Sequence, residues 1–399
     1  MNDTSAYQPY VEASWGLMNH WYPALFSREL GDDGLVGVQI AGVPILLRRL
    51  GGTVHALRDE CLHRGVKLSL QPTCLTADTV TCWYHGFTYR LADGQLRAIA
   101  VSPEDPLIGT VGLQTYPVAE RNGLVFVFVG DADYGPPPPL EADLPPLVDR
   151  SHRHWSPHIL DDDALVLGIR RRVRSNWRLG CENGFDPGHI FIHRNTTLVR
   201  VQGWNLPLGM RPVGPAAVSW LEDDADGPHG VRNEFGTDAY LPVNEHTGLG
   251  LEPLGAGVPA GSRTSMWMPC CLQVENFPER GLAQFEFYVP VDDQTHDYWE
   301  LIVAHCPTEA DETVFRRDYD DVWEPLGIYG FNDCDIFARE AMEPFYRHGG
   351  GFPAEVLCAT DAMTVAWRQL VSRHNRGVAR PGRPVAPDPE PPPSYRPAR

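Results

Sequence analysis

The sequence has almost no lysine, no surplus of positive charge and no long hydrophobic run. Lys67 is the one lysine in 399 residues, and the formal net charge is −19. Such a charge argues against binding to nucleic acid or to an anionic membrane surface. An apolar stretch of about eighteen residues, the length that a membrane span requires, is absent.

The chain also lacks the features of a secreted protein. Its first residues, MNDTSAYQPYVEASW, contain neither a basic segment nor an apolar one, and its nine cysteines do not have the spacing of a disulfide framework. We therefore expect a protein of the reducing cytoplasm. With 43% hydrophobic residues, a chain of this length can bury the cores of two domains.

Two short motifs each place a cysteine beside a histidine. Cys61-Leu-His63 is followed, after eighteen intervening residues, by Cys82-Trp-Tyr-His85. Two thiolates and two imidazoles are the ligands of a Rieske [2Fe–2S] cluster, in which the cysteines hold one iron and the histidines hold the other. The same four side chains also suit tetrahedral zinc, although zinc fingers usually pair cysteine with cysteine. We favour the cluster.

The region around these motifs has the pattern of β-structure. Short β-branched or aromatic segments separated by Gly, Asp or Pro predict strands at 36–40, 44–47, 54–57, 79–81 and 124–129. The run Gly135-Pro-Pro-Pro-Pro ends this region. We expect an all-β domain over residues 1–140, with its core at about 36–135.

The second part of the chain mixes strands and helices. An alternating run predicts a strand at 283–291, and helical spacing predicts helices at 308–325 and 361–374. Residues 202–262 are rich in Gly, Pro and acids, which indicates long loops over a few strands. We therefore expect a second domain over 141–378 and a disordered proline-rich tail over 379–399, in a protein of the α+β class.

A second group of possible metal ligands lies in the run Glu182-Asn-Gly-Phe-Asp-Pro-Gly-His-Ile-Phe-Ile-His193. On a helix, His189 and His193 would project from one face and bind one metal ion. A histidine pair alone is weak evidence, but an electron-transfer cluster in the same chain needs an acceptor. Iron held by two histidines and one carboxylate leaves positions open for O₂ and substrate.

The third ligand has two candidates. Asp186 lies three residues before His189, which is a short loop for a third facial ligand. Asp361, at the start of the second predicted helix, is the preferred candidate. As an alternative, Asp361 could interact only with the dipole of that helix.

Together these motifs resemble the catalytic subunits of the Rieske non-heme iron oxygenases, and most closely those that oxidise carbazole. The resemblance extends over nearly the whole chain and rests on these segments: His20-Trp-Tyr-Pro, Cys61-Leu-His-Arg-Gly-Val, Cys82-Trp-Tyr-His, Ser175-Asn-Trp-Arg-Leu, Glu182-Asn-Gly-Phe-Asp-Pro-Gly-His-Ile-Phe-Ile-His, Phe331-Asn-Asp-Cys-Asp-Ile-Phe-Ala-Arg-Glu-Ala-Met and Val365-Ala-Trp-Arg.

The resemblance implies an N-terminal Rieske [2Fe–2S] domain and a catalytic domain with an antiparallel sheet flanked by helices, similar to the helix-grip fold. It also implies mononuclear iron(II) and a head-to-tail homotrimer. In such a trimer Asp186 would bridge His85 of one subunit and His189 of the next. A carboxylate between two imidazoles would orient both rings and shorten the electron path.

The implied reaction is the dioxygenation of an aromatic substrate. Electrons from NADH or NADPH would arrive through a reductase and a ferredoxin, and O₂ would add two hydroxyl groups to carbazole at C1 and C9a, giving 2′-aminobiphenyl-2,3-diol. A related oxygenase acting on another heteroaromatic, such as 2-oxoquinoline, is the alternative.

The resemblance also suggests substrate and partner contacts. The Gly184 carbonyl would accept the substrate N–H, and the pocket would include these side chains: Thr264, Phe277, Gln284, Leu357 and Cys358. Thr264 stands where an aliphatic wall is expected, and Phe277 suits a plain core position equally well. Arg64 and Lys67, flanked by Arg58 and Arg90, would attract an acidic ferredoxin, or they could form a solvated rim that balances nearby acids.

Two other classes of protein remain as alternatives, and a visible absorption spectrum separates them. A Rieske electron-transfer protein without oxygenase activity would show the cluster spectrum but bind no iron at His189 and His193. A binding protein stabilised by zinc would be colourless. We expect the purified protein to be coloured by a Rieske cluster, and a colourless protein that contains zinc would contradict the cluster assignment.

Overall fold

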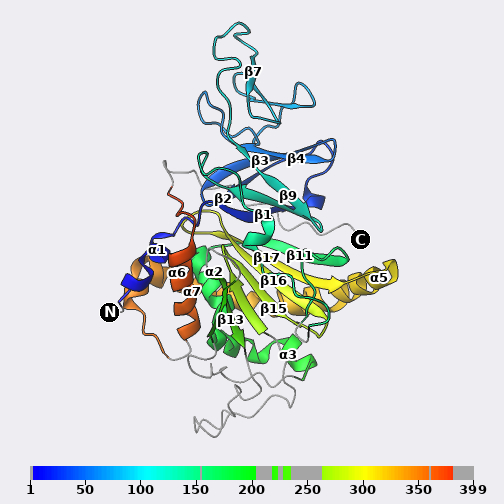
Figure 1. Cartoon of the computed structure of the whole chain (residues 1–399), viewed down its shortest axis with the longest axis vertical. Helices are drawn as coiled ribbons and strands as arrows, with labels where there is room; N and C mark the ends of the chain where they lie inside the picture. Colours follow the sequence, from blue (N-terminus) through cyan, green and yellow to red (C-terminus); the bar gives the residue numbers. More distant parts are fainter. Residues whose placement is uncertain are drawn as a thin grey trace.

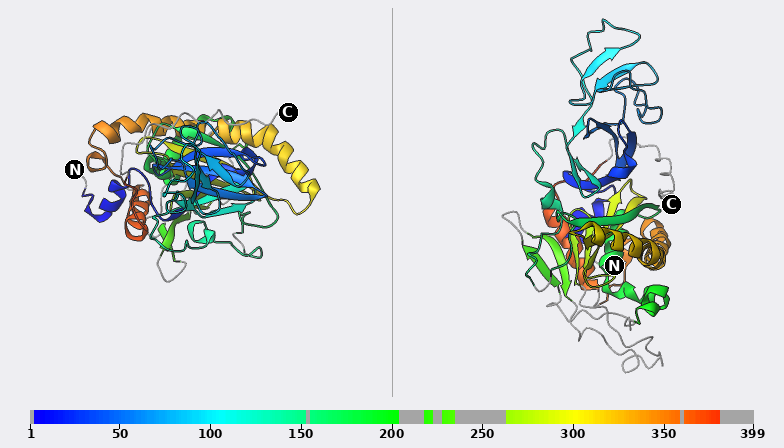
Figure 2. Two further views of the ribbon diagram at one scale, coloured as in Figure 1. Left: turned by 90° about the horizontal axis from the view of Figure 1, so that it is seen from above. Right: turned by 90° about the vertical axis from the view of Figure 1, so that its right-hand side faces the viewer.

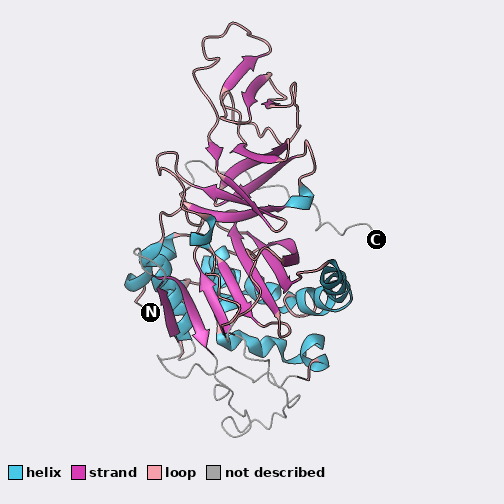
Figure 3. Ribbon diagram, turned by 45° about the vertical axis from the view of Figure 1, so that its right-hand side comes forward, coloured by secondary structure: helices cyan, strands magenta, loops and turns pink. Residues whose placement is uncertain are grey.

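The computed structural model describes residues 3–152, 155–203, 218–222, 228–234, 263–358 and 361–380. Strands and loops make up most of the upper part of the molecule, and the longer helices lie in the lower part (Figure 1, Figure 3). This arrangement agrees with the predicted order, in which an all-β region precedes a mixed one. The predicted domain boundaries stay predictions, and most of the 379–399 tail lies outside the described residues.

The upper part contains three antiparallel sheets. One has the order β1-β10-β9, with bounds β1 (His20–Phe26), β9 (Val118–Arg121) and β10 (Leu124–Val129). The next has the order β2-β3-β4-β8, with bounds β2 (Leu35–Ile40), β3 (Val43–Leu50), β4 (Thr53–Arg58) and β8 (Thr115–Tyr116). The third, at the tip, is β5 (Thr79–Thr81), β6 (Phe87–Arg90) and β7 (Leu96–Ile99). All five strands predicted for this region are confirmed.

The lower part is built on one seven-stranded antiparallel sheet of order β11-β17-β16-β15-β14-β13-β12. Its strands are β11 (Ala164–Val173), β12 (Val218–Glu222), β13 (Pro228–Glu234), β14 (Arg263–Trp267), β15 (Cys271–Glu275), β16 (Leu282–Pro290) and β17 (His296–His305). The strand predicted at 283–291 is β16.

The two faces of this sheet have different neighbours because side chains alternate along each strand. On one face, Phe287 and Trp299 contact the upper part: the Phe287 and Phe126 rings are 6.3 Å apart, and the Trp299 and Phe26 rings are 4.8 Å apart. The opposite face carries Glu286, whose carboxylate lies 3.9 Å from a nitrogen of Arg339 in the helix α6 (Asp333–His348). The sheet therefore joins the two parts of the molecule through one apolar face.

Helices cover the second face and the sides of the sheet. They are α1 (Gln8–Glu12), α2 (Trp177–Phe185), α3 (Thr197–Val201), α5 (Glu309–Asp318), α6 (Asp333–His348) and α7 (Ala362–His374). Shorter 3-10 segments are η1 (Ser5–Tyr7), η2 (Ser27–Glu29), η3 (Leu140–Asp143), η4 (Pro187–Asn195) and η8 (Phe352–Ala354), and η7 (Tyr319–Tyr329) is π-helical. The views in Figure 2 show the long helices gathered beside the lower sheet rather than beside the upper ones.

Both predicted helices are present, although the first, α5, ends at Asp318 and the rest of its predicted range belongs to the π-helical η7. A capping box at Thr308 starts α5, in which Thr308 and Asp311 each accept from the other's backbone N–H. In the second helix, α7, the side chains of Trp367 and Leu370 are fully buried. Within the described residues, no helix has both the length and the apolar character needed to cross a bilayer.

A buried arginine joins α7 to the start of the functional segment. The Nε and Nη2 atoms of Arg368 donate to the Glu182 carboxylate at 2.9 and 2.7 Å. Its Nη1 atom donates to the Glu355 carboxylate at 2.7 Å. Arg368 is 1% exposed, so this buried guanidinium helps to compensate the charge of both carboxylates.

We predict that Arg368→Met will destabilise the protein strongly, because it removes the buried guanidinium that binds the carboxylates of Glu182 and Glu355. The expected loss is about 3–5 kcal/mol, measured by denaturant unfolding. Arg317→Met removes a surface pair with Asp318, and it should change the free energy of unfolding by less than about 0.5 kcal/mol. Equal losses in the two variants would contradict this account of the Arg368 cluster.

Candidate functional site

Two loops of matching geometry present the four predicted cluster ligands at the tip. In each loop the cysteine carbonyl accepts from a glycine N–H: Cys61 from Gly65 at 2.8 Å, and Cys82 from Gly86 at 2.9 Å. Both glycines have positive φ, +69° and +71°. At Gly86 a Cβ would lie 2.5 Å from the Ala100 Cβ, so this position admits no larger residue without a shift.

The four ligands form two pairs. The Nδ1 atoms of His63 and His85 are 3.1 Å apart, and Cys61 and Cys82 lie together in one buried cluster. Both cysteines are buried, whereas His63 is exposed. Tetrahedral zinc would bring all four ligand atoms within about 4 Å of one another. In the part of the chain that the structure describes, no three of these four ligand atoms lie within 4.8 Å of one another. Separate pairs fit a two-iron cluster.

The predicted cationic rim is partly neutralised. Arg58 forms an ion pair with Glu60, and Arg90 pairs with Asp93. Arg64 is exposed, and the Lys67 carbonyl accepts from the Trp83 indole at 3.0 Å. Arg58 and Arg90 therefore belong to ion pairs with neighbouring acids of the rim.

The second group of ligands begins where α2 ends. Asp186 terminates α2, and its side chain also starts η4 by accepting from the Gly188 N–H at 2.7 Å. His189 and His193 both lie on η4, which is a 3-10 helix rather than the expected α-helix. Their rings are 5.4 Å apart and nearly perpendicular, at 86°. The short helix still directs both rings to one place.

A third side chain completes this group, and it is Asp335. Ligand atoms of His189, His193 and Asp335 all lie within 4.8 Å of one another. The Asp335 carboxylate is 3.6 Å from the His189 Nε2 and 3.4 Å from the His193 Nε2. These distances leave room for a metal ion between the atoms, and the combination of two histidines and one carboxylate suits iron(II).

The imidazoles themselves favour a bound metal. His193 is fully buried, and neither of its ring nitrogens has a hydrogen-bond partner among the described residues. The Phe331 ring stacks on it at 3.6 Å and 7°. The His189 Nδ1–H donates to the Asp186 carbonyl, which leaves Nε2 free as a ligand. A metal ion would supply the missing partner of His193.

The structure corrects the prediction for the third ligand. Asp361 is not in the group; it is the residue before α7, and its carboxylate accepts from the Cys358 N–H at 2.5 Å. Asp361 thus has the position that the alternative interpretation gave it, at the start of a helix. Asp335 lies within the run Phe331-Asn-Asp-Cys-Asp that carried the resemblance. In the sequence, Asp335 is recognisable only as an acidic residue in the first turn of a helix, and such residues are common without a metal.

The surroundings of Asp335 keep it charged. Burial alone would raise its pKa, but His193, His189 and Arg339 together hold the pKa of Asp335 well below its ordinary value. Asp186 behaves differently: burial raises its pKa, although His189 opposes this. The neighbouring charge of Asp361 adds to that rise. The Asp335 carboxylate is therefore the one that its neighbours keep ionised.

Two of the predicted pocket residues, Thr264 and Gln284, lie on the sheet face that carries Glu286. Thr264 is opposite Val274, and Val274 is opposite Gln284, so these three form a row across β14, β15 and β16. The Phe277 ring is 5.5 Å from that of Phe331, which itself stacks on His193. The structure thus brings Phe277 near the metal group.

The other predicted pocket positions are less uniform. A Cβ added at Gly184 would lie 1.9 Å from the Tyr288 hydroxyl, so only glycine fits this turn of α2. Leu357 is half-buried, whereas Cys358 is exposed in the isolated chain.

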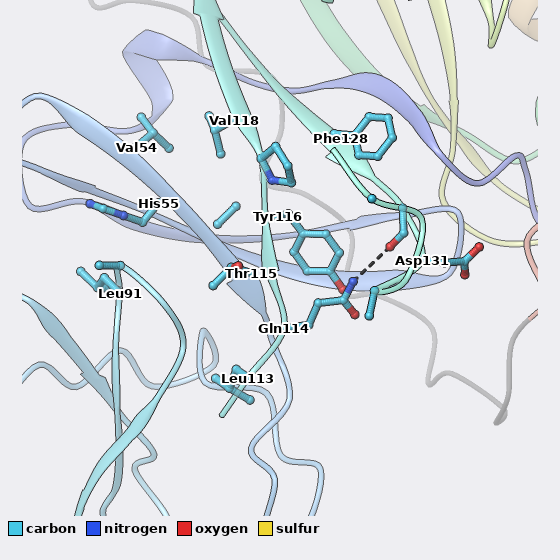
Figure 4. Close-up of a pocket in the computed structure, with 16 residues that line it drawn as sticks. Val54, His55, Leu91, Leu113, Gln114, Thr115, Tyr116, Val118, Phe128 and Asp131 are labelled. Carbon is cyan, nitrogen blue, oxygen red and sulfur yellow. Dashed lines mark hydrogen bonds between the residues drawn. The ribbon is translucent and has the colours of Figure 1, made fainter. Parts of the chain in front are cut away.

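A separate hollow lies in the upper part, between β4, β8 and the loop after β10 (Figure 4). Leu91, Leu113 and Tyr116 line it, and the Gln114 amide donates across to the Gly130 carbonyl at 3.0 Å. It contains none of the ligands of either metal group, so we assign no chemistry to it.

Comparison with known proteins identifies both parts of the chain. Residues 20–117 match the family model of the Rieske [2Fe–2S] domain, and residues 128–379 match that of the homotrimeric ring hydroxylases. The terminal oxygenase component of carbazole 1,9a-dioxygenase from Metapseudomonas resinovorans is 40% identical over 93% of this chain and 94% of the relative. The corresponding protein of a Sphingomonas species is 41% identical, over 94% and 96%.

Solved structures show the same fold. A component of 2-oxoquinoline 8-monooxygenase is 49% identical, with a TM-score of 0.91 over 96% of this chain and 91% of that one. A fluorene-bound oxygenase in the ferredoxin complex of carbazole 1,9a-dioxygenase is 39% identical, with a TM-score of 0.86 over 94% and 96%. The chain therefore belongs to the Rieske non-heme iron ring-hydroxylating oxygenases, which carry a [2Fe–2S] cluster and a mononuclear iron.

Proposed function

We propose that the chain is the terminal oxygenase of a multicomponent system that hydroxylates a fused nitrogen heteroaromatic. The observation that carries the proposal is the grouping of His189, His193 and Asp335 in a chain whose tip pairs two cysteines and two histidines. Iron held by His189, His193 and Asp335 would activate O₂. Cys61, His63, Cys82 and His85 hold the cluster that supplies its electrons.

The positions of the two metal groups support electron transfer between subunits. In Figure 1 the cluster loops lie near β7 at the top, whereas α2, which leads to Asp186, lies in the lower part. The family's name describes a homotrimer, and a head-to-tail arrangement of its subunits would bring the tip of one subunit to Asp186 of the next. There the Asp186 carboxylate would accept from the outer N–H of His85, while its backbone carbonyl holds His189.

The tip also suits entry of electrons from a ferredoxin. His63 is exposed, so it would hold its iron at the solvent-facing side of the tip, and solved structures of the carbazole enzyme contain a ferredoxin complex. Arg64 and Lys67 are the proposed contacts for an acidic partner. NADH or NADPH, through a reductase, would supply two electrons for each O₂ used.

The substrate contacts favour a ring system that carries an N–H group. The Gln284 Nε2 donates to the Glu286 carboxylate at 2.5 Å, which turns the amide oxygen of Gln284 away as an acceptor. The Gly184 carbonyl is the second proposed acceptor, and Phe277 supplies an aromatic wall. Two acceptors beside aromatic side chains would orient a flat N–H heterocycle over the iron.

Carbazole is the first candidate, because two curated relatives of matching length act on it. Adding two hydroxyl groups at C1 and C9a consumes one O₂, two electrons and two protons. The C–N bond at the hydroxylated carbon then opens to give 2′-aminobiphenyl-2,3-diol. A second candidate is 2-oxoquinoline, which is favoured by the 49% identity to the 2-oxoquinoline enzyme and by the polar Thr264 in the predicted wall.

We predict turnover of carbazole or 2-oxoquinoline by the purified protein with a compatible ferredoxin, reductase and NADH. Products are identified by mass spectrometry, and His189→Ala serves as the control because it removes one iron ligand. An enzyme with both metal centres loaded that oxidises neither compound would contradict the substrate proposal and leave the family assignment intact.

We also predict that Asp335→Ala will lose the mononuclear iron, whereas Asp361→Ala will retain it. Removing one of three protein ligands leaves too few to hold the ion, but Asp361 lies outside the group. Iron analysis, with the visible spectrum as a measure of intact cluster, separates the two sites. Loss of iron from Asp361→Ala alone would restore the original assignment.

A further inference from the structure

A buried polar chain runs from the iron carboxylate to the sheet. The Asn183 Nδ2 donates to the Asp335 Oδ1 at 3.2 Å, and the Arg339 Nε donates to the Asn183 Oδ1 at 2.5 Å. An Arg339 nitrogen then lies 3.9 Å from the Glu286 carboxylate. Arg339 is fully buried, and Asn183 is 6% exposed.

Arg339 is held by more than this one acid. Its guanidinium lies 4.3 Å from the centre of the Tyr298 ring and 4.9 Å from that of Tyr288. The Tyr288 hydroxyl also donates to Glu286. These contacts leave the guanidinium little freedom to rotate, so its Nε–H stays directed at Asn183.

We infer that Asn183 and Arg339 are positioning residues that fix the orientation of the iron carboxylate. The inference rests on the proposed role of Asp335. A side-chain amide has a donor end and an acceptor end, and it can turn around. Because a guanidinium can only donate, Arg339 forces the Asn183 oxygen toward itself and the Asn183 NH₂ group toward Asp335.

This arrangement has a direct effect on the metal site. Asn183 donates to Oδ1 of Asp335, so the other oxygen, Oδ2, which is 3.4 Å from the His193 Nε2, would remain available to a bound metal ion. Without Arg339, the amide could turn its oxygen toward the carboxylate and repel it. Partners of this kind typically change metal affinity by about 10- to 100-fold when they are removed.

The chain offers a matched control for Asn183. Asn332 is 2% exposed, and its Nδ2 donates to the buried Glu300 carboxylate at 3.1 Å. This is the same kind of bond, from a buried amide to a buried carboxylate, but Glu300 pairs with Arg171 and is not in the metal group. The Asn332 backbone carbonyl also accepts from the Asp335 N–H at 3.1 Å, but Asn332→Ala keeps that bond and removes only the amide that binds Glu300.

The test is equilibrium binding of Fe(II) to protein whose mononuclear site has been emptied and whose cluster is intact. We expect Asn183→Ala to weaken Fe(II) binding by about 10- to 100-fold, and to alter the EPR spectrum of the nitric oxide adduct of the iron. Asn332→Ala should match the wild type in both measurements. No substrate is needed, so the result does not depend on the substrate proposal.

Arg339→Lys provides a second variant in case Asn183→Ala does not fold. Lysine keeps the positive charge beside Glu286 but lacks the directed Nε–H, so Fe(II) binding should again weaken and the nitrosyl spectrum should change. The inference is overturned if Asn183→Ala or Arg339→Lys binds iron as the wild type does. It is equally overturned if Asn332→Ala loses as much affinity as Asn183→Ala, since the effect would then follow general destabilisation.

Discussion

A charged carboxylate in a dry site between two imidazoles is the constraint on which the catalytic part depends. Asp335 is 4% exposed, and a carboxylate so buried is costly unless several groups compensate for its charge. Here two histidines, an asparagine and an arginine surround it, and each comes from a different turn of α2, η4 or α6. The helices must pack on the sheet in one register for these groups to meet.

Much of the fold follows from local sequence signals. Strands β2, β3, β4, β5 and β10, the long strand β16 and the helices α5 and α7 were predictable, because their hydrophobic periods and turn residues agree with the final structure. The cluster loops were predictable for a different reason. Each loop is closed by hydrogen bonds within six residues, so its chemistry depends on near neighbours.

The third iron ligand was not predictable in this way. His189 and Asp335 are far apart in the sequence, and only the packing of α6 against α2 and η4 brings them together. Asp361 and Asp335 both lie at helix starts, where acidic residues are favoured whether or not a metal is present. Local pattern could not distinguish them. Asn183 was hidden for the same reason, since its role depends on Arg339 of a distant helix.

The shared sheet has a consequence for combining parts of such enzymes. Phe126 and Phe26 of the cluster-bearing region pack on Phe287 and Trp299 of the catalytic sheet, whose opposite face carries Glu286 and the polar chain to the iron. The two regions are therefore not separable modules joined by a tether. A chimera that exchanges the electron-transfer region with that of a relative would have to carry the matching aromatic residues of β16 and β17, or the altered packing would be transmitted through one layer of sheet to the oxygen-activating site.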